Sequence, residues 1–339
     1  MRTESRSSPE PGDPGSSVFA LEALRHTFRD GTVGLAGLDL AVPPGRIVGI
    51  LGSNGSGKST LLHLLATTLK PTAGRLHLFP SAPALTPRAR RRRIATVFEV
   101  APALPGLSGR ENIIRMTELR GASHREAEVA ADRWLDRFGL GRQGRRALFT
   151  YSFGMRRKVA LAEAFAARPR LLLLDEPLIG LDFRAREVLA ESLRSAATGG
   201  TTAVLALHDA EFARRACDRV ILLHAGCSVA DGPPDRLIAS LGRETVFEVT
   251  TVGPGVLEDA PPDPIRSLGS DGKVLRFTSS GGSASLPALA GWLTERGVEV
   301  RALRIREPNL EDLYVARTGI SLARSDPGSG GGGDGGRQG

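Results

Sequence analysis

The stretch GSNGSGKST has the residue types and spacing of a phosphate-binding loop. It follows the apolar segment RIVGIL and precedes the apolar segment LLHLLATTL, as expected for a loop between a strand and a helix. Glycines let consecutive backbone N–H groups turn toward an anion, and the helix N-terminus adds partial positive charge. In such a loop the Lys58 ammonium reaches the β- and γ-phosphates of a nucleotide, and the Ser59 hydroxyl ligates Mg²⁺. The predicted phosphate site consists of Gly52, Ser53, Asn54, Gly55, Ser56, Gly57, Lys58, Ser59 and Thr60.

Two acids follow one of the most apolar segments of the chain. LLLLDEP, residues 171–177, predicts a buried strand that ends in Asp175 and Glu176. Ligands of parallel sheets bind at the carboxyl ends of the strands. We therefore expect Asp175 to hold the metal, directly or through water, and Glu176 to act as the general base for an attacking water. The alternative is a pair of carboxylates at a solvated strand end.

A third motif, YSFGMRRKVALAEAFAARP, runs from Tyr151 to Pro169 and precedes these acids. Together the three motifs resemble the ATP-binding-cassette ATPases, in the Tyr-Ser-x-Gly-Met form found in exporters with a separate membrane subunit. The resemblance implies that Ser152 and Gly154 contact the γ-phosphate of ATP held by a second copy, in a head-to-tail dimer. A Ser at this position also caps its own helix, and the two roles are compatible.

The resemblance extends from about residue 19 to residue 318 and implies three further site residues. Phe28 lies where the family stacks an aromatic ring on adenine, although on the bare sequence it is equally a core residue. Asp182, in GLD, matches the loop that couples the two ATP sites. His208, in LALHDAE, lies where a switch histidine approaches the γ-phosphate, although a lone His after a strand is more often structural.

Glu99, in ATVFEV, departs from the family pattern. It occupies the position of a glutamine that reaches the Mg²⁺ and the attacking water and links the nucleotide to the helical insertion. An ionised Glu only accepts hydrogen bonds, whereas the amide also donates. We predict that Glu99 is an added metal ligand that makes activity more dependent on Mg²⁺. The alternative is that Glu99 merely ends a strand.

The segment EPNLEDLYVARTG, 307–319, resembles the closing segment of daunorubicin-resistance-type export ATPases, whose appended domain follows the cassette. On the residues alone it is a Pro at the start of an amphipathic helix. The resemblance implies an ATP-hydrolysing subunit of an ABC-2 type exporter, powering export of a drug-like or lipid-like substrate through a separate integral-membrane permease. We expect it to be cytoplasmic and peripheral on the inner face of the cell membrane.

The order of segments predicts an α/β fold: a P-loop cassette with a helical subdomain and a small C-terminal α+β domain. Two capping boxes, Ser108 with Glu111 and Ser123 with Glu126, predict helix starts in a helical insertion at about 108–150. Near the end, ETVFEVTT is expected to pair with KVLRFTS and VEVRALRI, which flank the helix LPALAGWLTERG. The predicted domains are a disordered tail (1–17), the ATPase domain (18–243), the α+β domain (244–318) and a Gly-rich tail (319–339).

Composition and charge argue against a membrane-spanning helix and against a nucleic-acid partner. No apolar run reaches the roughly 18 residues that a membrane-spanning helix needs. The net charge of +8 is almost wholly due to arginine, because only four of the 45 basic residues are lysine. The densest run, RARRRR (88–93), is either a lipid or phosphate contact or a solvated helix face. No aromatic residues interleave with it for base stacking, so nucleic acid is not an expected partner.

Other functions remain as alternatives at this stage. A cassette ATPase that acts on DNA or ribosomes usually carries a second cassette or a long coiled coil, and this sequence has neither. A P-loop kinase or GTPase does not explain YSFGM beside LLLLDEP. The two cysteines, Cys217 and Cys227, lack metal-ligand spacing and are interpreted as buried small hydrophobic residues.

Overall fold

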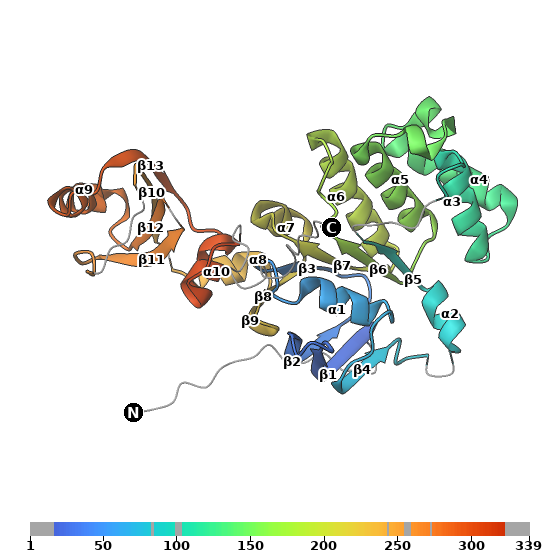
Figure 1. Ribbon diagram of the computed structural model, residues 1–339, viewed down its shortest axis with the longest axis horizontal. Coiled ribbons are helices and arrows are strands. Elements are labelled where there is room, and N and C mark those ends of the chain that lie inside the picture. The colour runs from blue at the N-terminus through green and yellow to red at the C-terminus, as the bar shows by residue number, and fades with distance from the viewer. Residues whose placement is uncertain are drawn as a thin grey trace, which may run out of the picture.

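A six-stranded sheet forms the centre of the computed structural model, which describes residues 17–82, 85–98, 104–242, 244–253, 259–271 and 273–322 (Figure 1). In spatial order its strands are β5 (Ile94–Val97), β6 (Leu171–Asp175), β7 (Thr202–Leu207), β3 (Ile47–Leu51), β8 (Arg219–His224) and β9 (Cys227–Gly232). The first five strands run parallel, and β9 is antiparallel at the edge. The carboxyl ends of β3, β6 and β7 therefore meet along one edge of the sheet, where ligands bind in such folds.

Helices bury both faces of this sheet, which explains its continuous apolar strands. Helix α1 (Lys58–Leu65) packs on one face; α5 (Phe153–Ala166), α6 (Phe183–Thr198) and α7 (Ala210–Ala216) pack on the other (Figure 1). Along β6, Leu171 and Leu173 point to the α1 side, whereas Leu172 and Leu174 point to the α5 side, and all four are fully buried. This is the alternation expected of a strand between two helical layers.

A second, antiparallel sheet covers α1 on the side away from the central sheet. Its order is β2 (Val33–Val42), β1 (Phe19–Thr27), β4 (Ala73–Leu78). The arginine run forms the short helix α2 (Pro87–Arg92), which Thr86 caps and none of whose residues is buried. Both the lipid contact and the solvated face are compatible with this position.

The helical insertion lies at one end of the molecule (Figure 1). It contains α3 (Gly109–Leu119), α4 (His124–Arg137), η2 (Gly141–Arg145) and η3 (Leu148–Thr150). Both predicted capping boxes are confirmed: Ser108 with Glu111 begins α3, and Ser123 with Glu126 begins α4. The two helices and α5 pack against one another.

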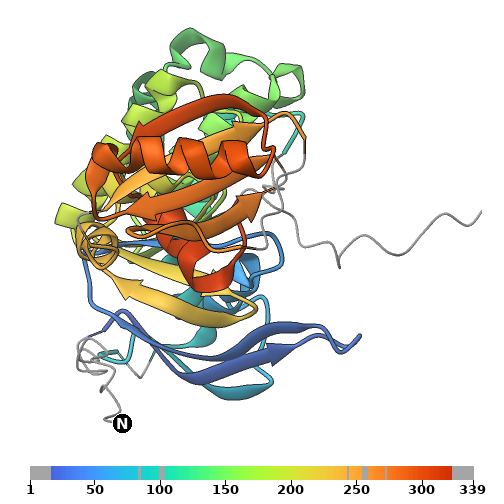
Figure 2. The same cartoon turned by 90° about the vertical axis from the view of Figure 1, so that its left-hand side faces the viewer.

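A third sheet stands at the opposite end, with α9 (Leu286–Glu295) on one face (Figure 2). Its antiparallel order is β11 (Ile265–Asp271), β12 (Val274–Ser279), β10 (Thr245–Thr251), β13 (Val300–Arg306). The expected pairing of β10 with both β12 and β13 is confirmed. The sequence did not predict β11, because IRSLGSD lacks a regular apolar alternation and follows a Pro-rich stretch. The segments α8 (Pro234–Ala239) and η4 (Gly282–Ser285) complete this half.

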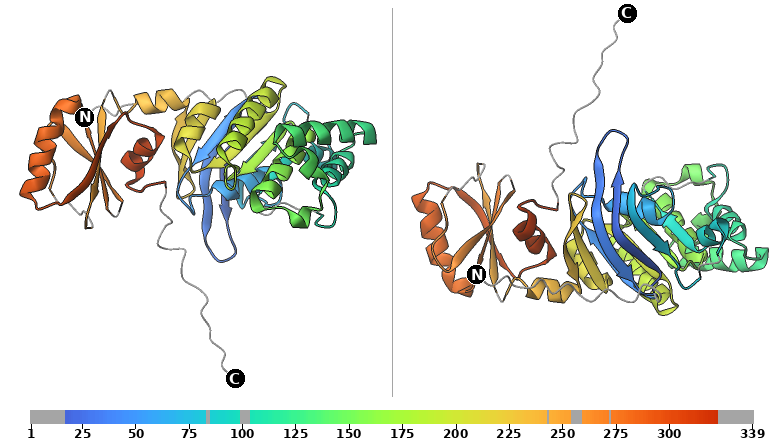
Figure 3. Two further views of the ribbon diagram at one scale, coloured as in Figure 1. Left: turned by 90° about the horizontal axis from the view of Figure 1, so that it is seen from above. Right: turned by 90° about the horizontal axis from the view of Figure 1, so that it is seen from below.

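Helix α10 (Leu310–Thr318) lies between the third sheet and the central sheet (Figure 3). Leu310, Leu313 and Tyr314 join the apolar cluster of the cassette rather than that of the small domain. The acids on α10 bind the sheet of the small domain instead, since Glu311 accepts from Arg276 at 3.0 Å. Helix α10, within the range predicted as the α+β domain, thus packs on both units.

The two cysteines differ from one another. Cys217 is buried in the cassette core, and burial raises the pKa of its thiol to about 12. Cys227, expected to be buried, is exposed because it begins the edge strand β9. Among the described residues, no helix is both long and apolar enough to cross a bilayer.

Asp312 fixes α10 to the small domain. Its carboxylate is fully buried, accepts from both terminal nitrogens of Arg306, one at 2.8 Å, and accepts from the Asn309 N–H at 2.8 Å. We expect Asp312→Ala to lower the free energy of unfolding by about 3 kcal/mol, because it leaves the Arg306 charge without its main partner. Urea unfolding of the full chain measures this loss.

The matched control is Asp259→Ala, which removes the largely exposed partner of Arg296. An exposed ion pair contributes less than about 1 kcal/mol. Equal losses for Asp312→Ala and Asp259→Ala would contradict the anchoring role of Asp312.

Candidate active site

The loop after β3 is shaped by glycines at positions where a side chain does not fit. A Cβ on Gly52 would lie 2.3 Å from the Leu223 carbonyl oxygen, and one on Gly57 would lie 2.3 Å from the Gly34 carbonyl oxygen. Gly57 also has a left-handed φ of 105° immediately before α1. No side chain caps α1, so its first N–H groups are available to an anion. The whole predicted set from Gly52 to Thr60 lies in this loop and the first turn of α1.

Lys58 is buried at the start of α1, and its ammonium holds the loop. Nζ donates to the carbonyl oxygens of Gly52 at 2.8 Å and Ser53 at 2.9 Å. Burial lowers the pKa of Lys58 to about 8, while the charges of Glu176 and Asp175 act in the opposite direction. The ammonium therefore lies within electrostatic reach of both predicted acids.

Asp175 ends β6 and is suited to a hard cation. Burial raises the pKa of its carboxyl group, while a hydrogen bond from Ser59 lowers it. Its Oδ1 is buried and has no hydrogen-bond partner within the described part of the chain. A buried carboxylate oxygen with free acceptor capacity, beside a hydroxyl, matches the oxygen ligands that Mg²⁺ prefers. In the described part of the chain, no group of three or more His, Cys, Asp or Glu side chains is arranged to hold a metal ion.

Glu176 is held in a strained backbone conformation beside His208. Its φ is 45°, in the left-handed region that costs a non-glycine residue about 1 kcal/mol or more. The Glu176 N–H donates to the Ala206 carbonyl oxygen at 3.1 Å. His208 Nε2 donates to Glu176 Oε1 at 2.9 Å, and about a third of each side chain is exposed. The Glu176 carboxylate is thus partly open to solvent and contacts His208, whereas Asp175 is buried.

Arg157, which sequence reasoning missed, fixes the strand ends beneath these acids. From α5 its buried guanidinium donates to the carbonyl oxygens of Phe98 at 2.9 Å, Glu176 at 2.7 Å and Asp175. It thereby joins α5 to the ends of β5 and β6. Its spacing carried a signal, because it lies four residues before the buried Leu161 and so on the apolar face of the helix.

The N-terminus of α5 forms a separate group of predicted residues. Ser152 caps the helix by accepting from the Met155 N–H at 3.2 Å, and Gly154 packs so closely that a Cβ would lie 2.5 Å from the Gly180 carbonyl oxygen. Asp182 caps α6 and accepts from Lys158 at 2.7 Å. Between described residues, no hydrogen bond or ion pair joins this group to the loop of Lys58.

Phe28 and Glu99 complete the predicted set. Phe28 is 38% exposed and lies beside α1, because a Cβ on Gly34 would meet both the Phe28 ring at 2.9 Å and Thr60 at 2.8 Å. An exposed ring at this position is not a core residue. Glu99 lies outside the described residues, and its metal role stays a prediction.

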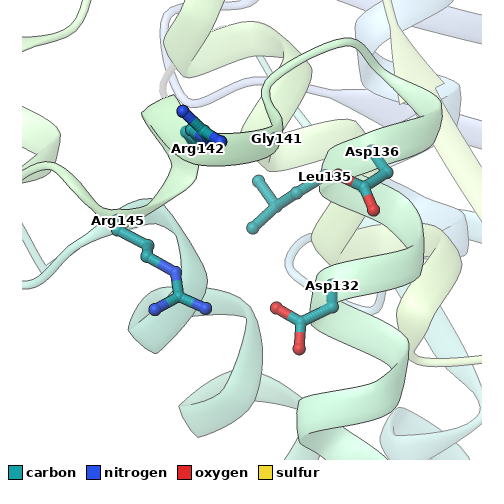
Figure 4. A pocket seen from close by; sticks show the side chains of 6 residues that line it. All are labelled: Asp132, Leu135, Asp136, Gly141, Arg142 and Arg145. Carbon is teal, nitrogen blue, oxygen red and sulfur yellow. The ribbon is translucent and has the colours of Figure 1, made fainter.

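A hollow of about 560 Å³ lies elsewhere, between α4 and η2 of the helical insertion (Figure 4). It is lined by Asp132, Leu135, Asp136, Gly141, Arg142 and Arg145. The two acids and two arginines balance one another in charge, and none of the predicted site residues lines the hollow. The chemistry of the loop and acids therefore does not extend to it.

Comparisons of sequence find a family and full-length relatives. A family profile described as "ABC transporter" matches residues 35–179. The daunorubicin/doxorubicin resistance ATP-binding protein DrrA of Streptomyces peucetius is 35% identical over 296 residues, covering 86% of this chain and 89% of that protein. The Nod factor export ATP-binding protein I of Rhizobium etli is 32% identical over 298 residues, covering 88% and 92%.

Comparisons of structure find cassettes that match about two thirds of the chain. An ATP-binding subunit of an ABC transporter superposes with a TM-score of 0.61 at 27% identity, covering 67% of this chain and 94% of that one. A dimeric ATP-binding cassette in a post-hydrolysis state, bound to ADP and phosphate, superposes with a TM-score of 0.57 at 26% identity, covering 63% and 98%.

The pKa of Lys58 predicts proton uptake when a nucleoside triphosphate binds. Because the free protein has a Lys58 pKa of about 8, phosphate charge should raise that pKa and draw a proton onto Nζ. The number of protons taken up is therefore small below pH 7, where Lys58 is already charged, and approaches one at about pH 9. Affinity should fall above pH 8, by at most about tenfold per pH unit.

Titration calorimetry in buffers of different ionisation enthalpy measures this uptake at about pH 7 and pH 9. The control is Lys70→Met, which removes an exposed lysine and should leave the uptake unchanged. Equal proton numbers at the two pH values would contradict the assignment to Lys58.

Proposed function

The chain belongs to the family of ABC transporter ATP-binding proteins, and from this premise we propose that it powers export of a drug-like or lipid-like substrate. The substrate would pass through a separate integral-membrane subunit of the ABC-2 type. Relatives named for daunorubicin resistance and Nod factor export support this, because their alignments cover 86% and 88% of the chain. An alignment of that extent includes at least part of the C-terminal domain.

The contact between Glu176 and His208, at the same sheet edge as Lys58, is the observation that carries the catalytic part of the proposal. The loop and Lys58 bind the phosphates of ATP, with the Phe28 ring beside the adenine. Glu176 accepts a proton from the water that attacks the γ-phosphorus, and His208 orients the carboxylate through its 2.9 Å contact. Phosphoryl transfer of this kind depends on positioning and charge stabilisation rather than on covalent catalysis.

The fit of Asp175 and Ser59 to a hard cation supports Mg²⁺ as the metal that accompanies ATP. Ser59 and Asp175 would hold it, with Glu99 as an additional ligand. When bound, the cation neutralises charge on the phosphates. Lys58, which precedes Ser59 at the start of α1, supplies further positive charge.

A second copy of the chain would complete each ATP site. Helix α5, which carries Ser152 and Gly154 at its start, and helix α1, which follows the phosphate loop, pack on opposite faces of the central sheet. This arrangement supports a head-to-tail dimer, in which Ser152 and Gly154 serve the ATP of the partner. Exposed apolar side chains surround them, namely Phe153, Ile179 and Phe183. In a two-fold symmetric pair, this patch on each copy faces the Lys58 loop of the other copy, and Asp182 lies within the patch.

The helical insertion would transmit the movement that opens the dimer to the membrane subunit, at the inner face of the cell membrane. We assign the ATPase to residues 18–243 and the appended domain to residues 244–318. Helix α10 is the exception, since its apolar face belongs to the ATPase core.

Glu176→Gln should separate ATP binding from hydrolysis. Removing the base should lower the hydrolysis rate about 10²- to 10⁴-fold, whereas ATP binding should persist because Lys58 is unchanged. The loaded dimer should then accumulate, as measured by light scattering with ATP. Glu191→Gln, at an exposed carboxylate on α6, is the control and should hydrolyse ATP normally. A Glu176→Gln chain that hydrolyses ATP at the wild-type rate is incompatible with the proposed base.

Gly154→Ala in the Glu176→Gln chain tests which copy each group serves. The added Cβ would meet the Gly180 carbonyl oxygen and displace the N-terminus of α5. We expect the ATP-dependent dimer to be lost while the monomer keeps its ATP affinity. A weaker monomer affinity would instead mean that Gly154 serves the ATP of its own chain.

Export is tested by co-expressing the chain with a candidate ABC-2 type integral-membrane protein from the same genome. The proposal expects the two to co-purify in detergent, and expects inverted vesicles to accumulate daunorubicin only with ATP and intact Glu176. A chain that neither co-purifies with the membrane protein nor supports accumulation is not its motor. Daunorubicin is the probe because relatives are named for resistance to it.

A further inference from the structure

The hydroxyl group of Tyr314 contacts the phosphate loop from the far end of the sequence. Tyr314 lies in the second turn of α10 and is fully buried. Its hydroxyl oxygen lies 3.1 Å from the Ser53 backbone nitrogen, which donates to it, and 3.1 Å from Ser53 Oγ. A residue of the C-terminal segment thus reaches the ATP site, 261 positions away in sequence.

The hydrogen-bonding capacity of this hydroxyl is fully used. A phenol has one donor and two acceptor positions. Tyr314 donates to the Leu223 carbonyl oxygen at 3.3 Å and accepts from the Ser53 N–H. Its remaining acceptor position faces Ser53 Oγ and His224 Nδ1, the latter at 3.3 Å. The Ser53 N–H, buried with the residue, receives its partner here.

The contact fixes a peptide group that also binds Lys58. The Ser53 N–H and the Gly52 carbonyl belong to one planar trans peptide, so they point in opposite directions. The N–H side donates to Tyr314, and the carbonyl side accepts from Lys58 Nζ at 2.8 Å. The Leu223 carbonyl oxygen, which accepts from Tyr314, lies where a side chain on Gly52 would have to be. The phenol therefore determines where the Gly52 oxygen holds the ammonium.

The small domain determines where the phenol lies. Glu311 and Asp312, which precede Tyr314 on α10, bind Arg276 and Arg306 of the small-domain sheet. The Tyr314 ring belongs to the apolar cluster of the cassette. One helix therefore links two arginines of the appended sheet to the phosphate loop within a single turn.

We propose that Tyr314 is a positioning residue of the ATP site, which orients the Gly52–Ser53 peptide and thereby the Lys58 ammonium. Through α10, the C-terminal domain sets how tightly Lys58 holds the phosphates. This inference rests on the proposed ATP site at Lys58. Tyr314 touches no reacting atom and acts only through the loop.

Tyr314→Phe removes the hydroxyl and keeps the ring that fills the core. The Ser53 N–H then loses its acceptor, and the loop is free to turn its carbonyls away from Lys58. We expect the KM and Kd for ATP to rise about tenfold with kcat changed less than about twofold, as when binding shared by ground and transition states is lost. Steady-state hydrolysis and ATP titration of the full chain measure both.

A purely structural role gives a different pattern. If Tyr314→Phe only reduces the fraction of folded protein, kcat per chain falls and KM is unchanged. If the hydroxyl has no role, neither kcat nor KM changes. Either result overturns the proposal. The matched control is Thr318→Val, which removes a hydroxyl that donates to the Tyr314 carbonyl oxygen at 2.7 Å within the same helix. Its KM for ATP should equal that of the wild type.

Two substitutions at Ser53 identify which of its atoms carries the effect of the Tyr314 hydroxyl. Ser53→Ala removes Oγ but keeps the N–H, so Tyr314→Phe should still raise KM about tenfold in that background. Ser53→Pro removes the N–H at a residue without positive φ, so Tyr314→Phe should add less than about twofold there. Equal effects of Tyr314→Phe in both backgrounds would overturn the proposed contact.

Lys58→Met separates this inference from the ATP site on which it rests. If Lys58→Met binds ATP as tightly as the wild type, the site and the inference both fail. If Lys58→Met loses ATP binding while Tyr314→Phe behaves as the wild type, only the role of Tyr314 fails.

Discussion

The burial of the Lys58 ammonium is the constraint on which the site depends. A buried charge must be compensated by nearby dipoles and opposite charges. Here the carbonyl oxygens of Gly52 and Ser53 bind Nζ directly, and the carboxylates of Asp175 and Glu176 favour its charged form. These groups come from the ends of β3 and β6, which have β7 between them. Only a parallel sheet brings three such ends to one edge, and β7 adds His208 there.

The same constraint explains why the surroundings of the loop are so closely specified. The Lys58 ammonium has three donors; two bind the Gly52 and Ser53 carbonyl oxygens, so the orientation of those peptides determines where the remaining donor meets a phosphate. Gly52 fits only without a Cβ, and the Ser53 N–H, on the far side of the Gly52–Ser53 peptide, donates to the Tyr314 hydroxyl. On the acid side, Arg157 holds the backbone of the strained Glu176. Both flanks of the site are thus fixed by residues to which the motifs assigned no role.

The local motifs were predictable from sequence, whereas the contacts that support them were not. GSNGSGKST and LLLLDEP each combine residue chemistry with an apolar flank that defines strand or helix, so the motifs alone were enough to predict that Lys58 begins a helix and that Asp175 ends a strand. Arg157 and Tyr314 act through backbone atoms of distant residues. Because nearly every residue has the same backbone carbonyl and N–H, the sequence does not indicate which of them make these contacts. Strand β11 was missed for the related reason that its pairing with β12, not its own composition, makes it a strand. The exposure of Cys227 likewise follows from the edge position of β9.

The ring and the hydroxyl group of Tyr314 contribute to the structure in different ways. A buried aromatic ring contributes through the apolar area that it removes from water, and a Phe ring would contribute nearly as much. The hydroxyl adds nothing to that term and costs free energy when buried without a partner. Its retention inside the core is therefore explained by the groups around it, Ser53, Leu223 and His224, rather than by packing. Because Ser53 belongs to the phosphate loop, the apolar face of α10 accounts for the docking of the small domain, and the hydroxyl accounts for its connection to the ATP site.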